Sequence, residues 1–149
     1  MQIRPMKETD LDAVEQISAE SSPQTTVWTR QQLGEILSRP SLYAAWVAEQ
    51  EGVVVGFLYL HLAGDEAEID NLAVSQAWRR QGIATFLLGT AWEYACGRGI
   101  SAMYLEVRAS NMAALRLYER AKFHEVGIRV RYYQSPEEDA IRLARNRNT

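Results

Sequence analysis

The fold of this chain is decided by the stretch Asn71-Leu72-Ala73-Val74-Ser75-Gln76-Ala77-Trp78-Arg79-Arg80-Gln81-Gly82-Ile83-Ala84. A β-rich run ends at Val74 and a helical pattern begins at Ile83, so the stretch predicts a strand, a turn and a helix. The first backbone N–H groups of a helix lack intrahelical partners and lie at the positive end of its dipole. Because Gly82 and Ala84 carry almost no side chain, phosphate oxygens can approach those N–H groups. The stretch therefore predicts an anion site at the start of a helix.

Two interpretations of this turn stay open on its own residues. Arg79 and Arg80 add positive charge and forked donors that suit a pyrophosphate. The same string also fits an exposed basic turn that begins an ordinary helix. The turn is not a Walker loop, because Gly-Lys-Ser/Thr is missing, and it lacks the three spaced glycines of the Rossmann fingerprint.

The flanking sequence alternates between strand and helix patterns. Strands are expected at Gln2–Met6, Tyr43–Glu49, Val53–His61, Ala67–Val74, Ala102–Val107, His124–Arg131 and Ala140–Leu143. Helices are expected after Thr9 or Asp10, after the capping box Thr29/Gln32, from Ile83 to the stops Gly97 and Gly99, and from Asn111 to about Ala121 with Ser110 as cap. Residues 21–26 are expected to form a loop. The order β-α-α-β-β-β-α-β-α-β-β predicts a mixed α/β (α+β) fold that contains an antiparallel meander.

Length and composition narrow the class of protein. The 149 residues suit one domain spanning 1–149, and 47% hydrophobic with 23% charged residues is ordinary for a globular protein. A net charge of −3 gives no general electrostatic footprint for nucleic acid. We expect no membrane span and no signal peptide, and hence a cytoplasmic protein. Cys96, the single cysteine, is expected in the core, and no metal-ligand spacing is found, so no metal is expected.

The decisive stretch resembles motif A of the GNAT acetyltransferase superfamily. The second half of the chain carries further strings, Leu105–Asn111, Leu117-Tyr118-Glu119, Phe123, Tyr132-Tyr133 and Glu138-Asp139-Ala140, which resemble the RimI-type ribosomal-protein alanine N-acetyltransferases. The resemblance covers roughly residues 67–141. It implies the GNAT acyl-CoA N-acyltransferase fold, in which a central, mostly antiparallel sheet has two splayed strands and is flanked by helices.

The resemblance also implies a cofactor site and catalytic roles. It implies binding of acetyl-CoA by Leu72, Ala73, Val74, Arg79, Arg80, Gln81, Gly82, Ile83, Ala84, Thr85, Asn111 and Tyr118. Within this set, the turn holds the pyrophosphate, Asn111 bonds the pantetheine, and a backbone N–H between Leu72 and Val74 serves the oxyanion. Glu106 is implied as the base, acting directly or through water, and Tyr118 as the acid.

The residues themselves agree with these implied roles. Asn111, Leu115 and Tyr118 stand at i, i+4 and i+7, so they share one helical face. Glu106 lies near the end of a predicted strand, where a side chain reaches a cleft at the edge of the sheet. Each residue also has a structural explanation. Glu106 suits a solvated carboxylate, Tyr118 a core aromatic, and Asn111 a residue in the first turn of a helix.

The acceptor is the least determined part of the prediction. An α-amine, with a pKa of about 8, costs roughly 1.4 kcal/mol to deprotonate at pH 7, whereas lysine costs about 4.6 kcal/mol. We therefore expect direct attack by a protein N-terminal α-amine in a ternary complex, with Trp28, Tyr132 and Tyr133 lining the acceptor site. Ordinary strand packing of the two tyrosines is the alternative. A small-molecule amine such as an amino acid, polyamine or antibiotic, and a non-catalytic CoA-binding module, are the other functions considered, and both monomer and homodimer stay open.

One position departs from the family. RimI-type enzymes usually carry Gly before the Phe that follows the Tyr118 helix, and this chain has Lys122. A glycine there fits a left-handed C-cap, so we expect Lys122 either to adopt that conformation or to change how the helix ends. The first forty residues match the family loosely, chiefly at Trp28-Thr29.

Overall fold

The computed structural model describes residues 1–21 and 28–147, so most of the loop predicted over 21–26 lies outside the described residues. The elements are β1 (Gln2–Pro5), η1 (Glu8–Asp10), α1 (Leu11–Glu20), α2 (Arg30–Leu37), β2 (Tyr43–Gln50), β3 (Val53–Ala63), β4 (Glu66–Val74), η2 (Gln76–Trp78), α3 (Ile83–Gly97), β5 (Ala102–Arg108), α4 (Met112–Arg120), β6 (His124–Tyr133) and β7 (Glu138–Asn146). The predicted order of strands and α-helices is confirmed, with two short 3-10 turns added.

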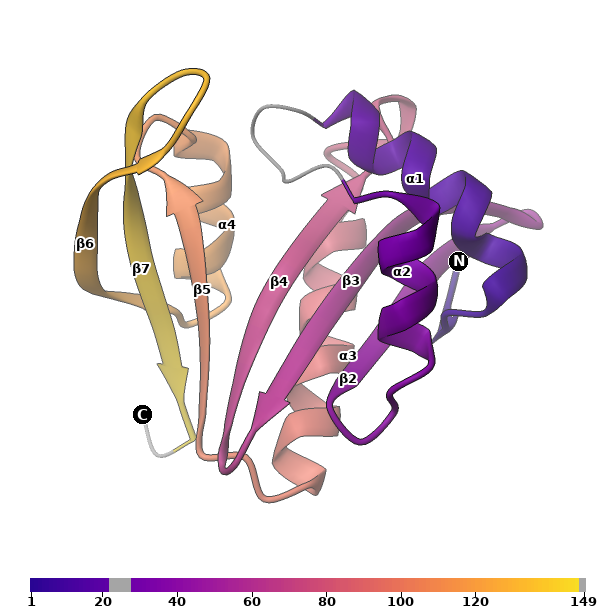
Figure 1. The fold of residues 1–149 in the computed structure, drawn as a ribbon, viewed down its shortest axis with the longest axis horizontal. Helices are drawn as coiled ribbons and strands as arrows, with labels where there is room; N and C mark the ends of the chain where they lie inside the picture. Colours follow the sequence, from indigo (N-terminus) through magenta and orange to yellow (C-terminus); the bar gives the residue numbers. More distant parts are fainter. Residues whose placement is uncertain (22–27, 148–149) are drawn as a thin grey trace.

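The strands form one sheet in the order β1-β2-β3-β4-β5-β7-β6. Neighbours pair antiparallel except β4 and β5, which run parallel. Their pairing is confined to Glu66–Glu68 opposite Ala102–Tyr104, after which the two strands separate, as Figure 1 shows. The predicted GNAT-type sheet with two splayed strands is therefore confirmed.

Helices cover both faces of the first half of the sheet (Figure 1). On one face, α1 and α2 pack with Phe57, Tyr59 and Ala73. On the other, α3 packs with Leu58 and Leu60, and this core continues into the second half of the sheet. Because β3 is buried on both faces, its sequence is a continuous apolar run rather than an alternation.

Helix α4 begins one residue later than predicted, and its C-terminal end has the left-handed conformation that was one of the two expected outcomes. Its N-cap is Asn111 rather than the predicted Ser110, because the Asn111 side chain accepts a bond from the Ala114 N–H at 3.2 Å. At its other end Lys122 adopts φ 73°, and the Phe123 N–H donates to the Tyr118 carbonyl at 2.9 Å. The expected left-handed cap is thus formed by a residue with a side chain.

The strain at Lys122 gives a stability prediction. A left-handed conformation costs a residue with a Cβ about 1–2 kcal/mol, part of which is offset by the extra freedom of glycine in the unfolded chain. We expect Lys122→Gly to raise the free energy of unfolding by about 1 kcal/mol in urea titrations. Lys122→Ala is the matched control, because it removes the same side chain but keeps the Cβ. An equal gain from the alanine variant would contradict the role of the backbone conformation.

Candidate active site

The separation of β4 and β5 opens the sheet at one end, and three segments converge there. Beyond the paired rungs, β4 runs on to Val74 and β5 to Arg108. The loop after β4 leads into the N-terminus of α3, and the loop after β5 leads into α4, so both helices begin at this end (Figure 1). The structure therefore brings the predicted stretches 72–74, 79–85 and 111 to one end of the fold.

The start of α3 has the features of an anion site. Gly82 adopts φ 80° at the N-cap, and no side chain caps the helix. A Cβ built at Gly82 meets one atom within 4 Å, the Phe86 Cε2 at 4.0 Å. The approach to the first N–H groups of α3 is therefore open, and the positive φ explains why the chain has glycine there.

The two arginines of the turn are placed differently from each other. The Arg79 Nε donates to the Val74 carbonyl at 3.1 Å, and its Nη2 donates to the Ser21 hydroxyl at 3.4 Å. Arg79 thus folds back onto the end of β4 and α1. Arg80 is exposed with φ 64°. Both arginines are exposed, and Arg79 differs from Arg80 in its hydrogen bonds to Val74 and Ser21.

Glu106 lies on the face of β5 opposite α3 and α4, because its neighbours Leu105 and Val107 belong to the core on the helix side. Its Oε1 accepts from the Arg142 Nη1 at 3.0 Å and lies 3.1 Å from the Arg129 Nε. Its Oε2 is buried and has no hydrogen-bond partner among residues 1–21 and 28–147. A buried acceptor without a partner costs free energy unless a water or ligand satisfies it, so Oε2 marks a place for a polar ligand atom.

Tyr133 lies near this carboxylate, and Tyr118 lies near Tyr133. Tyr118 is buried in α4, with its ring 5.7 Å from that of Phe123, and burial followed by the nearby Tyr133 raises its pKa. Burial raises the pKa of Tyr133 to about 12, with Glu106 and then Tyr132 as further causes. The structure therefore places Tyr133 near both Glu106 and Tyr118, with Tyr118 in the core on the helix side of β5, and both phenols stay protonated at neutral pH.

The remaining predicted acceptor residues occupy two separate places. Tyr132 is 50% exposed on β6, 5.1 Å from the Tyr133 ring, so its partner is the neighbouring tyrosine rather than the core. Trp28 packs against Tyr59 of β3, with 5.9 Å between ring centroids. The Trp28 Nε1 and the Tyr59 hydroxyl are both buried, and neither has a hydrogen-bond partner in the part of the chain that the structure describes.

The model of the acetyltransferase (GNAT) family matches residues 10–123 of this chain. The chain belongs to the GNAT acetyltransferase family. It is similar to the [ribosomal protein bS18]-alanine N-acetyltransferase of Escherichia coli, with 38% identity over 104 residues that cover 68% of this chain and 70% of the relative. It is also 33% identical over 141 residues to the putative enzyme of the same name from Bacillus subtilis, covering 93% and 91% of the two chains.

Solved structures agree with this membership. The crystal structure of the Escherichia coli ribosomal-protein-S18-alanine N-acetyltransferase superposes with a TM-score of 0.87 at 32% identity, covering 97% of this chain and 92% of that one. A ribosomal-protein-alanine N-acetyltransferase from Brucella melitensis gives the same TM-score at 23% identity, which is evidence for the fold alone. This GNAT protein is therefore an acetyl-CoA-dependent N-acetyltransferase, and the RimI-like resemblance seen in its sequence is confirmed.

Sequence reasoning missed several polar residues on the face of Glu106. Arg129 and Arg142 contact it, and Asp70 lies half-buried at a bulge in β4, where Leu60 pairs with Ile69 and Tyr59 with Asn71. The sequence of β4 does indicate the bulge, through the spacing of its core residues. Core residues on the α3 side of β4 are spaced by two at Ala67 and Ile69, but the next is Leu72, three residues on. This break in the alternation places an extra residue, Asp70, at the bulge.

Burial raises the pKa of Asp70 to about 6, with the nearby His61 opposing the rise and Glu68 adding to it. A carboxyl whose pKa is raised by folding makes the fold most stable at low pH, where it is neutral in both states. That contribution is lost as the pH rises from about 4 through about 6, because the folded protein must then hold a charge that it solvates poorly.

We therefore expect Asp70→Asn to stabilise the protein at pH 8 and not at pH 3.5. At 1.36 kcal/mol per pKa unit, and reduced for partial solvent exposure, the gain at pH 8 is about 1–2 kcal/mol. Urea titrations of both proteins at the two pH values measure it. An equal gain at both would assign the effect to packing instead of charge.

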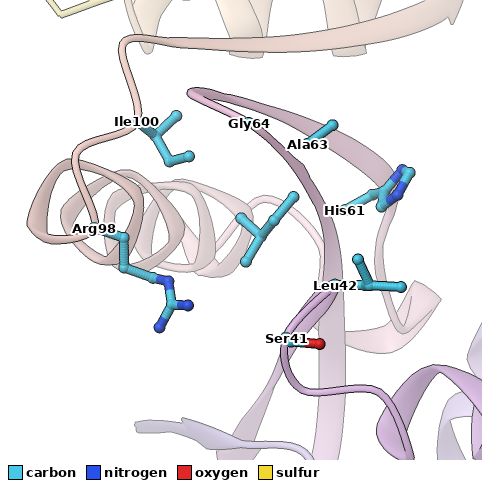
Figure 2. A pocket seen from close by; sticks show the side chains of 8 residues that line it. Ser41, Leu42, His61, Ala63, Gly64, Arg98 and Ile100 are labelled. Atoms are coloured by element: carbon cyan, nitrogen blue, oxygen red, sulfur yellow. The ribbon is translucent and has the colours of Figure 1, made fainter.

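A hollow of about 420 Å³ lies elsewhere on the molecule (Figure 2). Its lining comes from the end of β3 and the loops next to it, including Leu42, His61, Gly64 and Arg98. This is the end at which β4 and β5 are still paired. None of the predicted site residues lines it, so the hollow is separate from the end of the sheet where β4 and β5 are unpaired.

Two structural findings concern residues 1–21 and 28–147 as a whole. Within these ranges no helix is long and apolar enough to cross a membrane. The same residues contain no group of three or more His, Cys, Asp or Glu side chains arranged to hold a metal ion.

Proposed function

We propose that this acetyltransferase modifies the α-amine of a protein N-terminus by direct attack in a ternary complex. The observation that carries the proposal is the buried, unpartnered Oε2 of Glu106, which faces away from the core beside the separated strands. The names of its similar relatives, which act on an alanine of ribosomal protein bS18, favour the same class of acceptor.

The residues at the open end of the sheet fit acetyl-CoA. The open approach at Gly82 suits the pyrophosphate on the first N–H groups of α3, with Arg80 beside it. The unpaired edge of β4 at Leu72–Val74 offers backbone groups to the pantetheine arm and to the oxyanion. The Asn111 oxygen is already used in capping α4, so its amide NH2 is the group left to bond the pantetheine.

Acetyl-CoA, when bound, supplies an acetyl thioester. Glu106 takes a proton from the acceptor ammonium, directly or through a water molecule, and so frees the nitrogen lone pair for attack. A backbone N–H of β4 stabilises the charge that develops on the carbonyl oxygen. Tyr118, which its raised pKa keeps protonated, would give its proton to the departing sulfur as the C–S bond breaks, and the second proton of the attacking nitrogen would restore the phenol. The products are the acetylated amine and free thiol.

Further parts of the proposal concern the acceptor and the setting. Tyr132 and Tyr133 line the path of the peptide on one side, and Trp28 lines it on the other. We place the enzyme in the cytoplasm and treat residues 1–149 as one catalytic domain.

A small-amine acceptor has less support from the side chains. Asp65 and Glu66, which suit attraction of a cation, accept bonds from the hydroxyls of Ser101 and Tyr104 at the closed end of the sheet. Glu20 accepts the Gln76 N–H at 2.7 Å. Glu66 therefore bonds to the neighbouring strand β5, and Asp65 and Glu20 bond to the segments that follow α3 and β4.

The proposal is tested with synthetic peptides that begin with free Ala or Ser and contain one internal lysine. After incubation with acetyl-CoA, fragment-ion mass spectrometry is expected to place a single acetyl group on the first residue. The same peptide with a blocked N-terminus is the control and is expected to remain unmodified. Acetylation of free amino acids or polyamines without acetylation of any peptide would refute the proposed acceptor.

A further inference from the structure

Four charged side chains form a continuous ladder across four strands. The Arg142 Nη1 lies 3.2 Å from the Glu68 Oε1 and 3.0 Å from the Glu106 Oε1. On the far side, the Arg129 Nε lies 3.1 Å from the same Glu106 oxygen. Glu68 comes from β4, Glu106 from β5, Arg142 from β7 and Arg129 from β6. The ladder therefore reaches from one half of the splayed sheet to the other.

The ladder crosses the sheet at the vertex, the point at which β4 and β5 begin to separate. Glu68 pairs with Tyr104 in the last rung before β4 and β5 separate. The Arg142 guanidinium lies 4.7 Å from the centroid of the Tyr104 ring. Arg142 is therefore held at the vertex by a carboxylate from one half of the sheet and by a ring from the other.

The two carboxylate oxygens of Glu106 have different surroundings. Both arginines contact Oε1, and Oε2 is left buried without a partner. The Glu106 side chain is 10% exposed and that of Arg142 26%, so water screens their pair less than it screens a surface pair. Arg129 is 53% exposed, and its other contact among the described residues is the Tyr132 ring of its own strand, 5.2 Å away, so it restrains Glu106 less.

We propose that Arg142, anchored by Glu68, is a positioning residue that fixes the Glu106 carboxylate so that Oε2 alone is presented to the acceptor amine. This inference rests on the proposed role of Glu106 as the base. Arg142 acts through Glu106 and touches neither substrate. A single guanidinium nitrogen serves both carboxylates, so an ammonium at the same place can replace it.

The kinetic test compares variants of the full chain with an Ala-terminated peptide as acceptor. We expect Arg142→Met to lower kcat about 10- to 100-fold, because small misplacements of a reacting group cost that much, with the acetyl-CoA Kd changed less than about twofold. Arg142→Lys is expected to recover most of the loss. Glu68→Gln is expected to give a smaller loss than Arg142→Met. Arg129→Met, which removes a cation from the same oxygen, is the matched comparison and is expected to cost less than about threefold.

A double-mutant cycle separates positioning from a general structural role. If Arg142 acts through Glu106, then Glu106→Gln with Arg142→Met is no slower than Glu106→Gln alone. Losses that multiply in the double variant, or an Arg142→Lys variant as slow as Arg142→Met, would overturn the inference.

A second readout does not depend on the acceptor. In crystal structures of the two Arg142 variants, we expect the Glu106 carboxylate to have turned in Arg142→Met and to keep its orientation in Arg142→Lys. An unmoved carboxylate in Arg142→Met would refute positioning whatever the kinetics show. If the carboxylate turns as expected but no peptide is acetylated by the unmodified enzyme, the positioning stands and the proposed acceptor fails.

Discussion

Glu106→Gln is expected to lower kcat/KM for peptide acetylation by about 10²- to 10⁴-fold, the range that general bases contribute. Glutamine keeps the size of the side chain, and its oxygen can still accept from Arg142, but the amide takes up no proton. The acceptor must then attack from the small fraction that is already unprotonated in solution. The rate is measured by release of the coenzyme A thiol at saturating acetyl-CoA.

The matched control for this variant is Glu93→Gln, which neutralises an exposed carboxylate on α3. It is expected to leave kcat/KM unchanged within about twofold. Acetyl-CoA binding is expected to be the same in Glu106→Gln as in the unmodified enzyme, because Glu106 lies on the face of β5 opposite α3, away from the predicted pyrophosphate site. If Glu106→Gln retained more than a third of the unmodified rate, another group would have to serve as the base.

Gly82→Asp is expected to raise the acetyl-CoA Kd about 10- to 100-fold more than Gly82→Asn. Asn and Asp are the residues with side chains that best tolerate φ 80°, so both variants suffer a similar conformational strain. They differ by one negative charge placed beside the predicted pyrophosphate. Two like charges about 4 Å apart repel by about 4 kcal/mol at an effective dielectric of 20, and exposure to solvent lowers this to about 1.4–2.8 kcal/mol.

Isothermal titration of each Gly82 variant with acetyl-CoA measures the difference. The difference is expected to shrink at high salt, because the approach to the turn is open to solvent. Equal affinities of the Asp and Asn variants would place the pyrophosphate away from the start of α3.

The features that came from the sequence are those that depend on local chemistry. The turn at Gly82, the capping box at Thr29 and the long α3 follow from backbone needs that neighbouring residues reveal. The departure at Lys122 was also predictable, because a left-handed cap is a property of one backbone position. From these elements the sequence predicted the order of strands and helices and the anion site at the start of α3.

The surroundings of Glu106 were not predictable in the same way. Arg142 lies thirty-six positions from it in the chain and meets it through the pairing of β5 with β7. An arginine on a strand has no local pattern that names its partner, because the partner is set by the register of a neighbouring strand. Asp70 was missed for a related reason, since its place follows from a bulge that the alternation of β4 signals by one extra residue.

The ends of strands β6 and β7 were also not predictable from local sequence. The predicted ranges His124–Arg131 and Ala140–Leu143 followed apolar patterns, whereas the strands extend to Tyr133 and over Glu138–Asn146. β6 is an edge strand that is largely exposed, so backbone pairing with β7, rather than burial of side chains, determines its length.

The account as a whole is tested most directly by a crystal structure with coenzyme A and a peptide bearing a free N-terminal alanine. We predict the pyrophosphate on the first N–H groups of α3 at Gly82, the pantetheine between β4 and β5, and the peptide amine within hydrogen-bond reach of the Glu106 Oε2 or of a water bound to it. A peptide amine that approaches the thiol from elsewhere, with Oε2 still unpartnered, would contradict the account.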